Sequence, residues 1–194
     1  NGAVYINEKG EIAKEPVTDV ANYIKLGSVL PDANMAWRND FRWRNFNFGF
    51  MVSARLGGVV FSRTQSMLDY YGVSEATAAA RDAGGVMING NDLVDANKWY
   101  TAIGGGNSVP QYYTYSATNV RLQEASIGYT IPKKTLGDIC EITLSLVGRN
   151  LWMIYNKAPF DPETIATTGN YYQGVDYFMS PSMRNIGFNL RVKF

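Results

Sequence analysis

The chain of 194 residues contains no histidine and a single cysteine, Cys140. Without histidine there can be no Ser-His-Asp triad, no Cys-His pair and no site built on the commonest metal ligand. One cysteine permits no disulfide within the chain, and no histidine is present to activate its thiol. Cys140 is therefore interpreted as a small buried hydrophobic residue rather than as a nucleophile.

Charge and long apolar runs are also scarce. Charged residues make up 18% of the chain, and 18 basic side chains nearly balance 17 acidic ones. Because proteins that bind nucleic acid usually carry a basic excess, no nucleic-acid partner is expected. No apolar run approaches the roughly 20 residues of a transmembrane helix. The first residues also lack the basic start and apolar core of a signal peptide.

Apolar residues instead alternate with polar ones, which is the pattern of strands that have one apolar and one polar face. The predicted strands cover residues 35–43, 46–56, 119–131, 141–151 and 185–194. The first two form a predicted hairpin that reverses within residues 42–45. In the third, the alternation slips near Glu124. A β-bulge explains this slip, and so does a strand end that stands outside a membrane.

Short turns and long connections alternate between these strands. The long connections are residues 57–118 and 152–182. Ser62 and Ser74 are placed to cap two short helices, one running to about Tyr71 with Gly72 at its end, the other covering residues 75–83. Residues 103–116 are predicted to be flexible.

This order of short turns and long loops is typical of an outer-membrane barrel. Trp43, Phe46 and Tyr129 are then expected near one rim, as an aromatic girdle. Five strands cannot close a barrel without exposed edges, so the chain would be part of a larger barrel. A soluble β-sandwich with these faces packed together is an alternative that alternation alone does not reject.

Several segments carry a family resemblance. They are residues 39–65, 119–134 and 144–155, the Asp-Pro-Glu-Thr sequence from Asp161, and the closing GFNLRVKF. They contain the patterns R-L-x-x-x-S-x-G-Y-x-(L/I)-P, G-R-N-L and D-P-E in that order. In this respect the chain resembles the C-terminal region of the SusC/RagA family of TonB-dependent outer-membrane transporters.

The resemblance implies an all-β fold: about five C-terminal strands of a large antiparallel transmembrane β-barrel, with long extracellular loops that contain short helices. Residues 1–194 would form one C-terminal portion, and the plug and remaining strands would lie outside this chain. The implied location is the outer membrane of a Gram-negative bacterium of the Bacteroidetes, and the implied function is import of glycans or oligopeptides. From the residues alone, a soluble or surface-attached carbohydrate-binding β-module is the alternative, and a passive porin is a third interpretation.

The resemblance also implies partners. They are the rest of the barrel and its plug, a SusD-like surface lipoprotein that acts as a lid, TonB acting through the absent N-terminal region, the barrel-assembly machinery and the lipid bilayer.

Polar residues on the inward phase of the strands are predicted to face a wet lumen. They are Arg38, Asp40, Arg42, Arg55, Arg121, Arg149 and Arg191, with Asn189. Because charges inside a plugged barrel need partners, mutual pairing is favoured over direct substrate contact.

Aromatic residues of the long loops are candidates for contact with substrate or lid, since such rings stack on sugars and anchor protein interfaces. They are Trp99, Tyr100, Tyr112, Tyr113, Tyr115, Tyr171, Tyr172 and Tyr177. Packing within the loops explains them equally well.

The alternating apolar residues at the end of the chain resemble the signal that the barrel-assembly machinery recognises. They are Phe188, Leu190, Val192 and Phe194. Asp161, Glu163 and Asp176 have the chemistry of a paired-carboxylate hydrolase, but no pattern supports that use, and Asp161 is expected to begin a turn. We therefore expect no enzyme, no cofactor and no metal site.

Overall fold

The computed structural model describes residues 4–14, 19–88, 90, 92–166, 169 and 172–194. It separates into two compact units, which are described one at a time. The sheet unit comprises residues 30–58, 116–164 and 180–194, and the helical unit comprises residues 1–29, 59–115 and 165–179.

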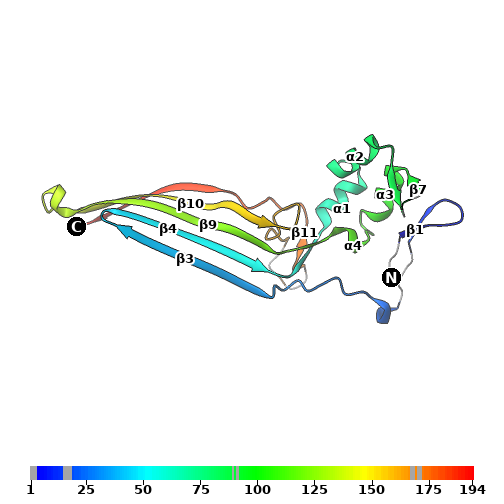
Figure 1. Ribbon diagram of the computed structural model, residues 1–194, viewed down its shortest axis with the longest axis horizontal. Helices are drawn as coiled ribbons and strands as arrows, with labels where there is room; N and C mark the ends of the chain where they lie inside the picture. Colours follow the sequence, from blue (N-terminus) through cyan, green and yellow to red (C-terminus); the bar gives the residue numbers. More distant parts are fainter. Residues whose placement is uncertain (1–3, 15–18, 89, 91, 167–168, 170–171) are drawn as a thin grey trace. The chain divides into compact units, whose positions relative to one another are not determined.

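The sheet unit is built on five long strands that lie side by side in the order β12-β10-β9-β4-β3 (Figure 1). All of its neighbouring strands are antiparallel. The strands are β3 (Ala33–Trp43), β4 (Phe46–Leu56), β9 (Asn119–Ile131), β10 (Glu141–Asn156) and β12 (Asn185–Lys193). The predicted strands are therefore confirmed, with β10 running beyond its predicted end at residue 151. The sheet does not close on itself, and β3 and β12 are its open edges.

The predicted turns are short, as expected. Arg44 and Asn45 alone join β3 to β4, and Arg44 has φ +54° and lies over the Trp43 ring. The turn between β9 and β10 contains a 3-10 helix, η2 (Lys133–Leu136), which ends at Gly137 with φ +67°. Cys140 lies at the end of this turn and is half-buried rather than fully buried.

A β-bulge in β9 causes the slip in its alternation. The register between β4 and β9 moves from Met51 opposite Glu124 to Val52 opposite Leu122, so Gln123 is an extra residue. On the other side of β9, the register moves from Arg149 opposite Glu124 to Trp152 opposite Leu122. The bulge interpretation is confirmed. Because of the extra residue, Leu122 lies on the apolar face of the sheet and Arg121 on the polar face.

The helical unit contains two helices that begin at the predicted caps. They are α1 (Arg63–Tyr70) and α2 (Glu75–Asp82). The Ser62 side chain accepts a hydrogen bond from the Gln65 N–H, and the Ser74 side chain accepts one from the Thr77 N–H. The capping residue at the end of α1 is Tyr71, and Gly72 follows it with φ +68°. Both cap predictions are confirmed.

Other elements of this unit were not predicted. They are β1 (Val4–Ile6), β2 (Ile12–Lys14), η1 (Val20–Asn22), β5 (Val59–Ser62), β6 (Val86–Ile88), β7 (Asp92–Val94), α3 (Ala96–Ile103), α4 (Pro110–Tyr113), β8 (Thr114–Ser116) and β11 (Val175–Asp176). The prediction of a flexible segment at 103–116 is wrong, since α4 and β8 lie there. Pro110 begins α4, where its missing N–H needs no partner.

A small apolar core holds the helical unit together. Its buried members are Ile88, Trp99, Ile103, Val109 and Tyr113. Side chains of the β1–β2 hairpin pack against it, and the Lys14 ammonium donates a hydrogen bond to the Asn107 carbonyl at 3.0 Å. Among the described residues, no helix has the length and apolar character needed to cross a membrane.

The bulge generates a first prediction. Deleting Gln123 would remove the extra residue, so that Leu122 follows Glu124 in strict alternation and Arg121 stays on the same face as Glu124. We therefore expect the full-length protein to fold without Gln123, measured as the yield of trypsin-resistant protein. Deleting Ser126 from the regular part of β9 instead turns Glu124 to the other face, away from Arg38 and Arg149, and should lower that yield. Equal yields of the two deletion variants would contradict this role of the bulge.

Candidate functional site

One face of the five-stranded sheet is apolar from strand to strand. The register aligns Phe41, Phe48, Ile127, Leu146 and Phe188 in one row across all five strands. These side chains are exposed, with Phe41 56% and Phe188 81% accessible. Within the sheet unit no second layer packs on this face, so nothing here supports a β-sandwich.

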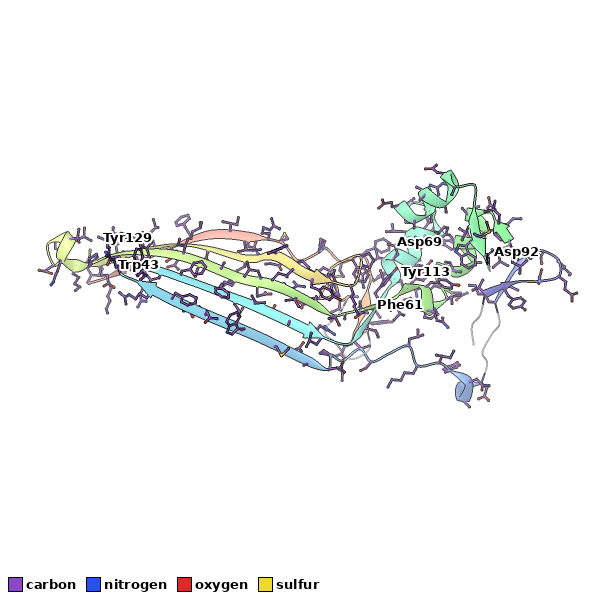
Figure 2. The ribbon with its side chains drawn as sticks, viewed as in Figure 1. Trp43, Phe61, Asp69, Asp92, Tyr113 and Tyr129 are labelled. Carbon is purple, nitrogen blue, oxygen red and sulfur yellow. The ribbon has the colours of Figure 1, made fainter. Side chains whose placement is uncertain are left out.

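The predicted girdle residues lie in a neighbouring row at the turn end of the sheet. Trp43 is opposite Phe46, and Phe46 is opposite Tyr129. The rings of Phe46 and Tyr129 meet edge to face with centroids 4.9 Å apart. Figure 2 shows Trp43 and Tyr129 together near the β3–β4 turn. The register thus gathers aromatic rings at one end of the apolar face, as the girdle prediction requires.

The opposite face carries the predicted lumen residues. By register and alternation, the face holds Arg38, Asp40, Arg42, Arg55, Arg121, Arg149 and Arg191. Glu124 lies between two of these arginines, with its carboxylate 3.8 Å from Arg38 and 3.4 Å from Arg149. Arg38 also contacts Asp40 at 2.9 Å. These arginines are mostly exposed, so each of their pairs contributes little to stability in the isolated sheet.

Arg121 differs from the other arginines because it is buried. Its side chain is 2% accessible. The guanidinium lies 2.8 Å from the Asp161 carboxylate and 3.3 Å from the Glu163 carboxylate. It also donates to the side-chain oxygens of Asn150, at 3.2 Å, and Ser182, at 3.3 Å. Arg121 is therefore the centre of a polar cluster at the end of the sheet far from the short turns.

This cluster closes the base of the connection between β10 and β12. Ser182 donates a hydrogen bond to the other oxygen of Asp161, so both ends of the intervening segment meet at Arg121. Asp161 also accepts a hydrogen bond from the Glu163 N–H, which confirms that Asp161 begins a turn. Burial raises the pKa of Asp161, but hydrogen bonds from Ser182 and Arg121 outweigh it and hold that pKa below its usual value. Asp161 therefore stays ionised opposite Arg121.

The predicted loop aromatics separate into buried and exposed groups. Trp99 and Tyr113 are core residues, 8% and 1% accessible. Tyr100 and Tyr115 are half-buried. Tyr112, Tyr172 and Tyr177 are exposed, and Tyr171 lies outside the described residues. Burial favours the packing interpretation for Trp99 and Tyr113, whereas Tyr112, Tyr172 and Tyr177 are accessible to another molecule.

A buried carboxylate near these tyrosines was missed in the sequence. Asp69, on α1, is 5% accessible and accepts a hydrogen bond from the Gln65 amide at 2.8 Å. Burial, and to a lesser degree the nearby Asp69 charge, raises the pKa of Tyr100, Tyr113 and Tyr115. Figure 2 labels Asp69 and Tyr113 in this unit. The Asp69 charge influences the Tyr113 hydroxyl electrostatically, but that hydroxyl forms no hydrogen bond with any described residue. These tyrosines therefore stay neutral at physiological pH.

The carboxylates considered for catalysis have structural partners. Asp161 and Glu163 share Arg121, while Asp176 accepts a hydrogen bond from the Ser62 hydroxyl at 2.7 Å. That bond joins β11 to Ser62, the last residue of β5 and the N-cap of α1. Among the residues that the structure describes, no group of three or more potential ligand side chains is placed to hold a metal ion.

The chain is similar to curated TonB-dependent receptors. It is 25% identical over 177 residues to TonB-dependent receptor P3 of Formosa agariphila, an alignment that covers 87% of this chain and 17% of that protein. It is 26% identical over 204 residues to TonB-dependent receptor P26 of the same organism, covering 100% of this chain and 20% of that protein. No protein-family model matches the chain.

Solved structures show the same fold. The RagAB peptide importer in its open-open state matches 96% of this chain with a TM-score of 0.66 and 14% identity. In its closed-closed state it matches 98% with a TM-score of 0.67 and 12% identity. The resemblance to SusC/RagA-family TonB-dependent receptors is confirmed. The chain spans about a fifth of the length of the relatives it matches.

Arg121 generates a second prediction. Arg121→Met in the full-length protein would leave Asp161 and Glu163 without their cation and should weaken closure of the connection by about 3–5 kcal/mol. We expect faster amide hydrogen exchange in residues 157–164 and in residues near Ser182, measured by mass spectrometry.

Arg42→Met is the matched control. Arg42 lies on the same face but makes no ion pair among the described residues, so its loss should leave exchange in the connection unchanged. If both variants exchange at the wild-type rate, Arg121 does not close the connection.

Proposed function

We propose that this chain forms part of the wall and outer loops of an outer-membrane importer that takes up nutrient oligomers with energy from TonB. The observation that carries the proposal is the two-faced antiparallel sheet, which is apolar and exposed on one side and charged on the other. A membrane barrel needs this division, because one face meets lipid and the other meets water. The names of the relatives support the same function.

The charged face would line the lumen. The Arg38, Glu124 and Arg149 side chains then strengthen one another more than on an exposed surface, since a plugged lumen holds less water. Arg42 and Arg191, which have no acidic partner among the described residues, are available for acidic groups of the plug or of the remaining barrel wall. We therefore assign these arginines to contacts within the receptor rather than to the cargo.

The exposed loop tyrosines would contact the cargo or a SusD-like surface lipoprotein that covers the outer mouth. Tyr112, Tyr172 and Tyr177 combine an exposed ring with a hydroxyl, which suits both sugar stacking and protein contact. Oligopeptides are the favoured cargo, since the structurally similar RagAB is named a peptide importer. Glycans are the other class. We place the receptor in the outer membrane of a Gram-negative bacterium of the Bacteroidetes, with the barrel-assembly machinery acting on its strands.

Uptake by cells that express the full-length receptor tests the function directly. We expect accumulation of a fluorescent oligopeptide pool, and loss of that accumulation when a protonophore removes the proton gradient or when the partner lipoprotein gene is deleted. A fluorescent oligosaccharide pool in parallel cultures identifies the cargo class. Uptake that persists without the gradient would contradict an energised importer and favour a passive porin.

The apolar face generates a separate prediction. Phe41 and Ala36 lie on opposite faces of β3, and both are exposed in this chain. In water, arginine at either position would change stability by only about 0.5 kcal/mol. In a bilayer, Phe41→Arg should cost about 2–4 kcal/mol while Ala36→Arg is tolerated. The measurement is the amount of folded receptor in the outer membrane, scored by heat-modifiable mobility. Equal amounts of both variants would show that this face does not meet lipid.

A further inference from the structure

A hollow interrupts the apolar face of the sheet. The residues that line the hollow suit one kind of ligand. We propose that the hollow over Ala125 and Gly148 is a seat for one lipid acyl chain. This inference rests on the proposed function, because it requires the face to meet a bilayer.

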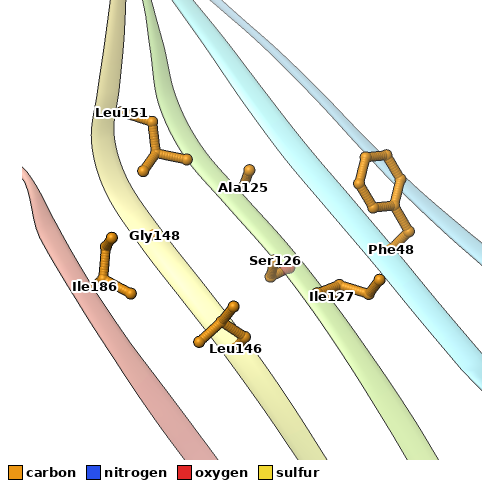
Figure 3. Close-up of a pocket in the computed structure, with 8 residues that line it drawn as sticks. All are labelled: Phe48, Ala125, Ser126, Ile127, Leu146, Gly148, Leu151 and Ile186. Carbon is orange, nitrogen blue, oxygen red and sulfur yellow. The ribbon is translucent and has the colours of Figure 1, made fainter.

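The hollow arises where small residues meet on adjacent strands. One row of the register contains Asn39 on β3, Phe50 on β4, Ala125 on β9, Gly148 on β10 and Ile186 on β12. Large side chains surround the two small residues: Figure 3 shows Leu146, Leu151 and Ile186 around Gly148, with Ile127 and Phe48 on the far side of Ala125. The space measures about 260 Å³.

The bulge shapes one wall of this hollow. Asn150 has φ +54°, and the register with β9 shifts between Arg149 and Trp152. The Leu151 side chain consequently lies over Gly148, where a Cβ would come within 2.6 Å of it. Gly148 is therefore needed for Leu151 to form the wall, and the hollow is a built feature of the sheet rather than a gap between flexible side chains.

The lining favours hydrocarbon over a polar ligand or a protein. The side chains of Phe48, Ala125, Ile127, Leu146, Leu151 and Ile186 contribute no hydrogen-bonding group. The Ser126 hydroxyl lies on the opposite face, 3.0 Å from where a Cβ of Gly49 would stand. Protein interfaces usually have a polar rim, but the rows on both sides of this hollow are apolar. Apolar cavities of about 150 Å³ already bind small hydrocarbons.

The hollow lies at the depth in the membrane where lipid acyl chains are expected. The row of Trp43, Phe46 and Tyr129 lies toward the turns, and the row of Trp37 and Trp152 lies on the other side. Aromatic residues concentrate at the two interfaces of a bilayer. The hollow between these rows is therefore at the depth of acyl chains rather than of headgroups, so the contact is with a chain and not with a particular headgroup.

Photolabelling tests the seat in the full-length receptor. The receptor is reconstituted into phosphatidylethanolamine vesicles that contain phosphatidylethanolamine with a diazirine near the end of one acyl chain, and labelled peptides are mapped by mass spectrometry. We expect excess labelling of residues 125–127 and 146–151 over other residues of the apolar face, such as Leu190. Ala125→Leu should fill the hollow and abolish that excess. Ala54→Leu, the same change on the same face outside the hollow, should preserve it.

The outcomes separate this inference from the proposed function. Uniform labelling of the whole apolar face would overturn the seat but support a lipid-facing wall. Labelling that spares only the hollow would mean that a protein segment or a second copy occupies it, which also overturns the seat. Absence of labelling along the entire face would overturn both the seat and the membrane assignment.

Discussion

One bulge in β9 determines how the end of the sheet far from the short turns is built. If Gln123 took part in the strict alternation of a regular strand, Arg121 would lie on the apolar face and Leu122 on the charged face. Because the bulge leaves Gln123 out of the pairing, Arg121 lies on the charged side and reaches Asp161. The matching irregularity in β10 puts Asn150 in a left-handed conformation, from which its side chain accepts a hydrogen bond from Arg121. The same irregularity lays Leu151 over Gly148. The bulge thus accounts for the buried ion pair on one face and for the hollow on the other.

The ion pairs of the charged face have unequal weight. The contacts of Arg38 and Arg149 with Glu124 are largely exposed, and such pairs contribute about 0–1 kcal/mol. Arg121 is almost inaccessible to solvent, so its desolvation is large and must be offset by several partners. It has them in two carboxylates, a hydroxyl and two amide oxygens. Removing one of these partners would leave a buried charge without its full set of contacts. The base of the connection is therefore stable only when Arg121 and all of its partners are present.

The sequence was sufficient to predict those elements whose structure is determined by residues close together in the chain. The long strands follow from alternation, and α1 and α2 follow from Ser62 and Ser74, whose hydroxyls satisfy the first backbone N–H groups. The short strands of the helical unit are too brief to show a period. Helix α3 did leave a signal, because Asp95 caps it and Trp99 and Ile103 lie one turn apart on its buried side. The partnership of Arg121 with Asp161 spans 40 residues and has no local pattern, so only tertiary structure shows it. The same holds for the buried Asp69.

The edges of the sheet place a last constraint on the proposed importer. Strands β3 and β12 each have one neighbour, so half of their backbone N–H and C=O groups have no partner in the sheet. Proteins protect such edges with prolines, bulges or inward charges. Neither β3 nor β12 contains a proline, and their charged residues Arg38, Asp40, Arg42, Arg191 and Lys193 all lie on the charged face, which leaves both edges open to pairing. In hydrocarbon each unpaired group would cost several kcal/mol. If this sheet stands in a bilayer, further strands must therefore continue it beyond both β3 and β12, and the five strands are stable only as an arc of a closed wall.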